Sequence, residues 1–330
     1  MWLPQNAIIA VTYRCNGRCL TCDIWKKKNK KELPSHFYSR LPSSLKDINL
    51  TGGEPFLRND LPDIVRVIKK TCPKAKIIIN TNGLLPQIIT KASEKIIDAA
   101  PNTAIRVSLD GWEDTHDKIR GIKGSFQKAM VTLQKLKKIP VKDLGISFTL
   151  IETNKNQLLK LYEFAQKNKL QFSITTATSS EIYFGKNKEK LRPKVNNILK
   201  DNFSLLEKGY YQSFWPKDWF RGWFASSLRE YLITGKRPFV CDADKNFFYL
   251  DPEGNIFPCH IKNWLLGNLQ KQTFTQIWQD TKRKNYQNLV NSCHDCWMVC
   301  TAKTSIKTNF IKVLPRVIIN KTKFPNHHAA

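Results

Sequence analysis

The sequence predicts an α/β protein built as a partial (β/α)6 barrel of the TIM type, followed by a small cysteine-rich auxiliary domain. Short apolar runs rich in β-branched residues alternate with longer segments whose apolar residues recur at spacings of three and four. This alternation is typical of parallel β/α units. A second group of cysteines lies beyond the last of these units, toward the end of the 330 residues.

Six strands and four helices are predicted in the first half of the chain. Each strand run is short, and each helical run has one apolar face. The predicted strands are 7–11, 47–50, 76–79, 104–109, 144–150 and 170–175. The predicted helices are 60–70, 85–99, 126–138 and 156–168.

The segments that follow the first four strands hold the residues best suited to chemistry. In parallel β/α folds, the carboxyl ends of the strands and the loops after them form the active face. We therefore expect these segments to meet at one rim of the barrel. They are 15–22, 51–55, 80–83 and 108–111.

Eight of the nine cysteines fall in two clusters. The chain has no run of eighteen apolar residues and no secretory signal pattern, which predicts a cytoplasmic protein. Thiols stay reduced in that compartment, so clustered cysteines indicate metal binding and not disulfides. Cys72 stands alone, and we interpret it as a small buried apolar residue.

The first cluster places Cys15, Cys19 and Cys22 in one short loop that also contains Gly17. A structural zinc site uses four ligands, and so does a simple electron-carrying iron-sulfur cluster. Three neighbouring thiolates therefore indicate an iron-sulfur cluster with one open iron.

This CxxxCxxC spacing after the first predicted strand resembles the radical S-adenosylmethionine (radical SAM) family. Residues 52–55 resemble its GGE segment, and 81–83 and 108–111 resemble segments of its peptide- and sugar-modifying branches. The resemblance covers residues 7–175 in the expected order. One difference is Thr21, since an aromatic or bulky residue usually precedes the third cysteine.

The resemblance implies that the three cysteines hold a [4Fe-4S] cluster and that S-adenosylmethionine binds its fourth iron. Reductive cleavage would yield a 5′-deoxyadenosyl radical, which would abstract a hydrogen from the substrate. A reductant such as a flavodoxin or a ferredoxin would supply the electron. The residues predicted to bind the cosubstrate are Gly52, Gly53, Glu54, Asn82, Ser108, Asp110 and Asn154.

The second cluster contains five cysteines. Their spacing alone fits a zinc site of four thiolates as well as an iron-sulfur site. The arrangement also resembles the SPASM and twitch extensions of radical SAM enzymes, which implies one auxiliary [4Fe-4S] cluster. The predicted ligands are Cys241, Cys259, Cys293 and Cys296, with Cys300 as a substitute ligand or a spare thiol.

Changes in composition predict four parts of the chain. Aromatic residues crowd the second part, and we interpret them as packing between domains, with a membrane interface as the alternative. The predicted parts are a radical SAM core at 1–178, an aromatic and basic bridge at 179–236, an auxiliary cluster domain at 237–302 and a basic tail at 303–330.

The chain carries 54 basic and 27 acidic residues, for a net charge of +27. This excess favours an anionic partner, although a bias in genome composition explains it equally well. The preferred substrate is a phosphate-linked sugar or lipid precursor. The alternatives are a ribosomally made peptide and, in another class, a non-catalytic iron-sulfur electron-transfer protein. Peripheral contact with an anionic membrane is also predicted, whereas the absence of nucleic-acid motifs argues against nucleic acid as a partner.

Overall fold

A single curved sheet forms the centre of the protein, which we describe from a computed structural model for residues 3–27 and 31–324. Its nine strands follow the order β6-β5-β4-β3-β2-β1-β7-β8-β9, and every neighbouring pair from β6 to β7 is parallel. The strands are β1 Asn6–Ala10, β2 Asp47–Thr51, β3 Lys76–Thr81, β4 Ala104–Ser108, β5 Asp143–Leu150, β6 Gln171–Thr176, β7 Phe247–Leu250, β8 Asn255–Phe257 and β9 Gly267–Asn268.

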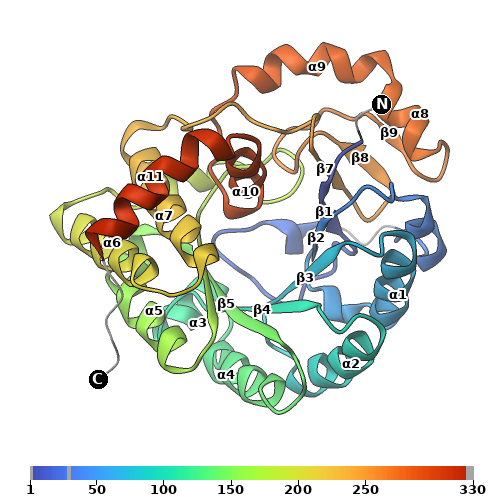
Figure 1. The fold of residues 1–330 in the computed structure, drawn as a ribbon. Coiled ribbons are helices and arrows are strands. Elements are labelled where there is room, and N and C mark those ends of the chain that lie inside the picture. Colours follow the sequence, from blue (N-terminus) through green and yellow to red (C-terminus); the bar gives the residue numbers. More distant parts are fainter. Residues whose placement is uncertain (1–2, 28–30, 325–330) are drawn as a thin grey trace.

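Helices cover the outer side of the curved sheet (Figure 1). The α-helices are α1 Leu61–Thr71, α2 Pro86–Ala99, α3 Asp114–Arg120, α4 Ser125–Leu136, α5 Leu158–Lys167, α6 Asn197–Tyr211, α7 Pro216–Thr234, α8 Phe274–Gln279, α9 Thr281–Asn291, α10 Val299–Thr308 and α11 Phe310–Lys323. Short 3-10 turns lie at η1 Ile24–Lys26, η2 Ser35–Arg40, η3 Pro55–Leu57, η4 Glu152–Gln157 and η5 Lys188–Leu191.

The partial (β/α)6 barrel predicted from the sequence is confirmed. All six predicted strands are present with small differences at their ends, and the four predicted helices correspond to α1, α2, α4 and α5. In α1, the buried residues Leu61, Ile64, Val65 and Ile68 follow the spacing of three and four that predicted the helix. Local apolar periodicity was therefore enough to locate these elements.

The predicted bridge contains two helices that the sequence analysis did not assign. Helix α6 packs beside α5 and supplies the helix of the sixth β/α unit, and α7 packs along α6. Trp223 and Phe224 of α7 are buried and lie against Trp297, so this part of the aromatic segment packs between the barrel and the C-terminal region.

The cysteine-rich C-terminal region extends the sheet of the barrel. Strand β7 pairs in parallel with β1, in register from Asn6 with Phe247 to Ile9 with Leu250, and β8 and β9 continue as antiparallel strands. The sheet therefore runs across the predicted boundary at residue 237. The described part of the predicted tail, up to residue 324, is helical and comprises the end of α10 and all of α11.

The described residues form two large apolar cores and a third, small cluster of Ile119, Ile151 and Ala177. The larger lies between the sheet and its outer helices. The smaller lies on the other side of β1 and β7, where Ile8, Ala10 and Tyr249 pack together with cysteines from both clusters. Among the residues that the structure describes, no helix combines the length and apolar character needed to cross a bilayer.

Because β7 covers the edge of β1, a chain that ends at Gly235 is expected to lose cooperative folding. Residues Asn6–Ala10 are all buried, and their free edge would then be exposed. Circular dichroism and size-exclusion chromatography of the shortened chain should show aggregation or no cooperative melting transition. A monomer that melts as cooperatively as the full chain would contradict this expectation.

Candidate functional site

The loop after β1 brings three cysteine side chains together. A Cβ atom added to Gly17 would lie 3.4 Å from the sulfur of Cys19 and 3.5 Å from that of Cys15. Cys22 lies close enough for its ionisation to be influenced by both of these thiols. The three predicted cluster ligands therefore lie near one another in the loop that follows β1.

The loop after β2 touches the loop after β1 through two glycines. A Cβ on Gly52, which has a φ of +143°, would lie 2.3 Å from the carbonyl oxygen of Thr12. A Cβ on Gly53 would lie 2.0 Å from the carbonyl oxygen of Arg14. The amides of Gly53 and Glu54 each donate to these carbonyls at 2.8 Å. Only glycine fits at this contact, because any side chain would push the two loops apart.

Glu54 connects the loop after β2 to the loop after β3. Its buried carboxylate accepts hydrogen bonds from the Thr81 hydroxyl at 2.9 Å, the Asn82 amide at 2.7 Å and the Phe56 amide at 3.2 Å. Burial raises the pKa of Glu54 to about 7, although the three donors favour the charged form. Its carboxylate therefore has a clear structural role in joining the two loops.

Asn82 lies directly beside the first cysteine loop. Its side-chain nitrogen donates to the Asn16 side-chain oxygen at 2.7 Å and lies 4.0 Å from the Cys15 sulfur. Its side-chain oxygen accepts from the Leu84 amide at 3.0 Å. Asn82 thus lies beside the first cysteine loop, and its contact with a cosubstrate stays a prediction.

Asp110 reaches the cysteine loop through an arginine. Its buried carboxylate lies 2.7 Å from the guanidinium of Arg120 and accepts from the Thr149 amide at 2.7 Å. The same guanidinium lies 3.6 Å from the Cys19 sulfur. Burial alone would lower the pKa of Arg120, but the charges of Asp110 and Cys19 outweigh burial and raise it. A permanent cation therefore lies against this cysteine.

The other two predicted contacts are Ser108, the last residue of β4, and Asn154, in the 3-10 turn η4 that follows β5. Ser108 is half-buried and pairs with Ser147 of the neighbouring strand. The Asn154 side-chain nitrogen donates to the carbonyl oxygens of Asp110 and Thr149, so this side chain stabilises the turn after β5. Contact of either residue with a cosubstrate stays a prediction.

Tyr183, which the sequence analysis did not identify, contacts the end of β2 and the loop after it at Thr51 and Gly52. Its hydroxyl lies 2.9 Å from the Thr51 hydroxyl and 3.2 Å from the Gly52 amide, and it donates to the Gly52 carbonyl. The next residue, Phe184, accepts at its carbonyl from the Asp23 amide at 2.7 Å. This polar stretch has no apolar periodicity, so nothing in the sequence indicated that it returns to the rim.

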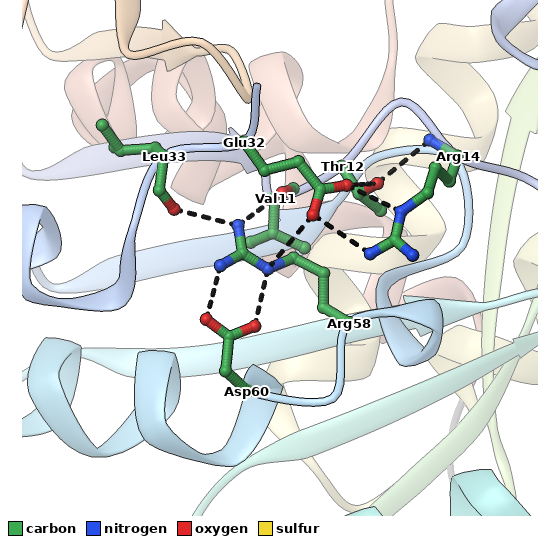
Figure 2. A network of polar contacts seen from close by, with 7 residues as sticks. All are labelled: Val11, Thr12, Arg14, Glu32, Leu33, Arg58 and Asp60. Carbon is green, nitrogen blue, oxygen red and sulfur yellow. Dashed lines mark hydrogen bonds and ion pairs between the residues drawn. The ribbon is translucent and has the colours of Figure 1, made fainter. Parts of the chain in front are cut away.

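Arg58 fixes the end of β1 from below the loops (Figure 2). Its buried guanidinium donates to the carbonyls of Val11 at 3.1 Å and Leu33 at 3.0 Å, and it forms a two-pronged pair with Asp60. Glu32 lies 3.8 Å from the same guanidinium. One buried cation thus joins the backbone of two separate segments, at Val11 and at Leu33.

Glu32 extends this network to the residues just before the first cysteine. Arg14 donates to both of its carboxylate oxygens, at 2.9 and 3.0 Å, and Thr12 also donates to it (Figure 2). Because Arg14 immediately precedes Cys15, the network fixes the start of the cysteine loop.

The C-terminal cysteines form a second group. The thiol of Cys241 is near three others. In addition to burial, the charge of Cys296 raises the pKa of Cys241, and the charge of Cys241 raises the pKa of Cys259 and of Cys293. Cys300, in the first turn of α10, interacts with Cys296. The structure therefore brings the five predicted residues together, with Cys300 near Cys296.

A second buried arginine lies against this group. Arg237 donates to the Cys296 carbonyl at 2.8 Å, lies 3.6 Å from the Cys296 sulfur and reaches the Ser305 hydroxyl at 3.2 Å. Its guanidinium also stacks over Trp297 at 5.0 Å. The sequence analysis did not identify this residue.

The chemistry of these thiols fits iron-sulfur centres. Burial raises the pKa of Cys15 and Cys241 to about 11 and that of Cys22 and Cys300 to about 12. Without a cation these thiols stay protonated, and iron supplies the positive charge that makes them thiolate ligands. Across residues 3–27 and 31–324, no three His, Cys, Asp or Glu side chains enclose a position for a single metal ion.

A cavity of about 590 Å³ opens between the bridge and the C-terminal region. Both basic and acidic side chains line it, and His294 and Asp295 belong to the loop between Cys293 and Cys296. The other charged residues around the cavity are Glu181, Lys186, Glu189, Arg192 and Lys262.

Arg58→Ala is expected to lower the free energy of unfolding by about 3 kcal/mol, because it leaves buried carbonyls and a carboxylate without their cation. Arg66→Ala is the matched control, since the Arg66–Asp63 pair is exposed and should contribute less than about 1 kcal/mol. Urea unfolding of both variants measures the difference. Equal loss of stability in the two variants would contradict the role assigned to Arg58.

Two family models match the chain. The Radical SAM superfamily model matches residues 9–165, and the model of the SPASM iron-sulfur cluster-binding domain matches residues 241–297. The first runs from the end of β1 into α5 and includes the loop of Cys15, and the second covers four of the five C-terminal cysteines.

Known proteins resemble the chain over most of its length. It is 24% identical over 326 residues to the AdoMet-dependent heme synthase of Methanosarcina barkeri, covering 89% of this chain and 88% of the relative. It is 26% identical over 293 residues to the sporulation killing factor maturation protein SkfB of Bacillus subtilis, covering 84% of this chain and 65% of the relative. The crystal structure of Streptococcus suis SuiB bound to precursor peptide SuiA matches with a TM-score of 0.64 at 17% identity, covering 91% of this chain and 71% of that chain, which supports the fold.

These comparisons agree with the geometry of the two cysteine groups. The chain belongs to the radical SAM superfamily: it is an enzyme that uses [4Fe-4S] clusters and S-adenosylmethionine, and it carries a SPASM-type iron-sulfur cluster-binding domain after its barrel.

Proposed function

We propose that Cys15, Cys19 and Cys22 hold the cluster that binds S-adenosylmethionine, and that one auxiliary cluster lies in the C-terminal group. The observation that carries this proposal is the meeting of the three-cysteine loop with the loops after β2 and β3 at one rim. The auxiliary ligands are Cys241, Cys259, Cys293 and Cys296, whose thiols form one group.

The bound cluster and cosubstrate supply the 5′-deoxyadenosyl radical that abstracts hydrogen from the substrate. The protein holds these groups in place and keeps water from them. Gly52 and Gly53 let the backbone approach closely, Glu54 sets the position of Asn82, and Asp110 orients Arg120 beside the cysteine loop. Ser108 at the end of β4 and Asn154 in η4 after β5 complete the proposed cosubstrate-binding set.

The substrate that we propose first is an anionic small molecule, either a phosphate-linked sugar or a lipid precursor. The net charge of +27 supports this choice, and so does similarity to a heme synthase, because heme carries carboxylates. Acidic side chains line the 590 Å³ cavity together with basic ones. The preference for an anion therefore depends on the charge of the whole chain and not on this cavity.

A ribosomally made peptide is the second candidate. The chain resembles SkfB, a maturation protein, over 84% of its length, and this similarity favours a peptide substrate. The fold also matches that of SuiB, whose crystal structure contains a precursor peptide. Either substrate requires an electron donor such as a flavodoxin or a ferredoxin. Deuterium transfer from a labelled substrate into 5′-deoxyadenosine would distinguish the two substrate classes.

After anaerobic reconstitution and reduction with dithionite, the protein is expected to convert S-adenosylmethionine to 5′-deoxyadenosine. The triple variant Cys15→Ala, Cys19→Ala, Cys22→Ala should produce none, because its cluster has no ligands. Cys72→Ala is the matched control, since the Cys72 sulfur is buried below α1 at 3.4 Å from the Pro42 carbonyl, away from both groups. Chromatography of the products measures the yield. A protein that binds iron but yields no 5′-deoxyadenosine would overturn the proposal.

Iron analysis tests the four auxiliary ligands. The wild-type chain should hold about eight iron atoms, and Cys296→Ala should hold about four. Cys300→Ala should retain about eight, because Cys300 lies beyond the residues that the model of the SPASM domain matches. Four iron atoms and one zinc in the wild-type chain would instead support the zinc alternative. If only the Cys300 variant lost iron, Cys300 would be the cluster ligand and Cys296 the spare thiol.

A further inference from the structure

Helix α11 turns an apolar stripe toward solvent. Ile311 is 86% exposed and Ile318 is 49% exposed, and with Pro315 they follow the spacing of four and three that places residues on one face. On the opposite face, Val313 and Val317 are buried in the main core. The helix is therefore anchored by one side and leaves a second apolar side uncovered in the described structure.

Basic residues lie along one edge of this stripe. Lys312, Arg316 and Lys323 are exposed and follow one another at spacings of four and seven. No acidic residue occurs in the sequence after Asp295. α11 itself therefore contributes only positive charge beside the apolar stripe, and Glu230 of α7 is the acidic side chain that shares a small pocket with Arg316.

The turn between α6 and α7 adds two exposed aromatic side chains, Phe214 at 68% and Trp215 at 69%. The residues that flank this turn contact the end of α11. The Lys321 ammonium donates to the Tyr211 carbonyl at 2.7 Å and lies 5.4 Å from the centre of the Trp219 ring. The Trp219 indole nitrogen donates to the Ser213 carbonyl, which belongs to the turn. The aromatic turn and α11 therefore belong to one surface, on the side where Figure 1 shows α11 packed over α7.

We propose that this surface, formed by α11 and the turn at residues 212–215, docks the enzyme onto an anionic lipid bilayer. An amphipathic helix with Lys and Arg beside an isoleucine stripe lies in the plane of the headgroups, and Trp side chains anchor at the same depth. Each basic side chain near the surface adds attraction to anionic lipids. A neutral groove on a partner protein could cover the exposed isoleucines, but it would offer no counter-ions to Lys312, Arg316 and Lys323.

Vesicle flotation of the full chain tests the proposal with two lipid mixtures. The protein should float with vesicles of phosphatidylcholine and phosphatidylglycerol, should stay down with phosphatidylcholine alone, and should bind less at high salt. Tryptophan emission should shift to the blue on binding, and Trp215→Phe should reduce this shift. The absence of flotation with both mixtures would overturn the proposal.

Two surface variants separate the apolar contribution from the charge. Ile311→Glu with Ile318→Glu should abolish binding. Lys312→Gln, Arg316→Gln and Lys323→Gln together should weaken it roughly a hundred-fold. The matched control, Lys91→Gln, Lys95→Gln and Lys128→Gln, removes the same charge from exposed positions on α2 and α4, on the far side of the barrel (Figure 1), and should bind normally.

All variants should keep the wild-type melting temperature, because every substituted side chain is exposed. Equal weakening by the control would attribute binding to net charge and overturn the assigned surface. A wild-type dimer that the glutamate variants convert to monomer would instead assign the stripe to contact between copies. The assay does not measure catalysis, so its failure leaves the proposed function standing.

Discussion

The contact between the loops after β1 and β2 determines where everything else at the rim can lie. Backbone hydrogen bonds continue the pairing of these strands beyond their ends, from the Val11 amide to the Glu54 amide. They require bare backbone at Gly52 and Gly53, where a Cβ would overlap the facing carbonyls. The first cysteine of the loop then follows at once, with its Cβ 2.9 Å from the place of a Gly53 Cβ. The cysteine loop is thus positioned by main chain, which has far less freedom than side chains.

Strand β1 connects the two cysteine groups. One edge of β1 pairs with β2 and the other with β7, so the loops at both ends of the sequence reach the same apolar core. Ile8 and Ala10 on β1 and Tyr249 on β7 form its floor, and cysteines of both groups pack around it. This arrangement joins the SPASM region to the barrel through shared strands instead of a flexible linker.

The sequence revealed what depends on local pattern and missed what depends on distant contacts. Apolar periodicity located β1 to β6, and the spacing of Cys15, Cys19 and Cys22 indicated the first centre. The pairing of β7 with β1 joins residues about 240 apart in the sequence, and no local signal specifies it. Tyr183 returns to the rim from a polar stretch for the same reason. The sequence does contain a helical signal for α7, because Trp219, Phe220 and Trp223 follow helical spacing. The many neighbouring aromatic residues made this periodicity hard to recognise.

Burial of the two centres also creates an electrostatic requirement, which the fold meets in the same way twice. Thiolate ligands carry negative charge, and removing that charge from water is costly unless a cation or hydrogen bonds compensate. Arg120 lies 3.6 Å from the Cys19 sulfur and Arg237 lies 3.6 Å from the Cys296 sulfur. Each guanidinium is fixed by other partners, Arg120 by Asp110 and Arg237 by backbone and side-chain oxygens around it. Such outer partners tune a metal centre as well as stabilise it. The difference between the two arginines lies in their direct partners: Arg120 pairs with the Asp110 carboxylate, whereas Arg237 bonds to carbonyl and hydroxyl oxygens and stacks over Trp297.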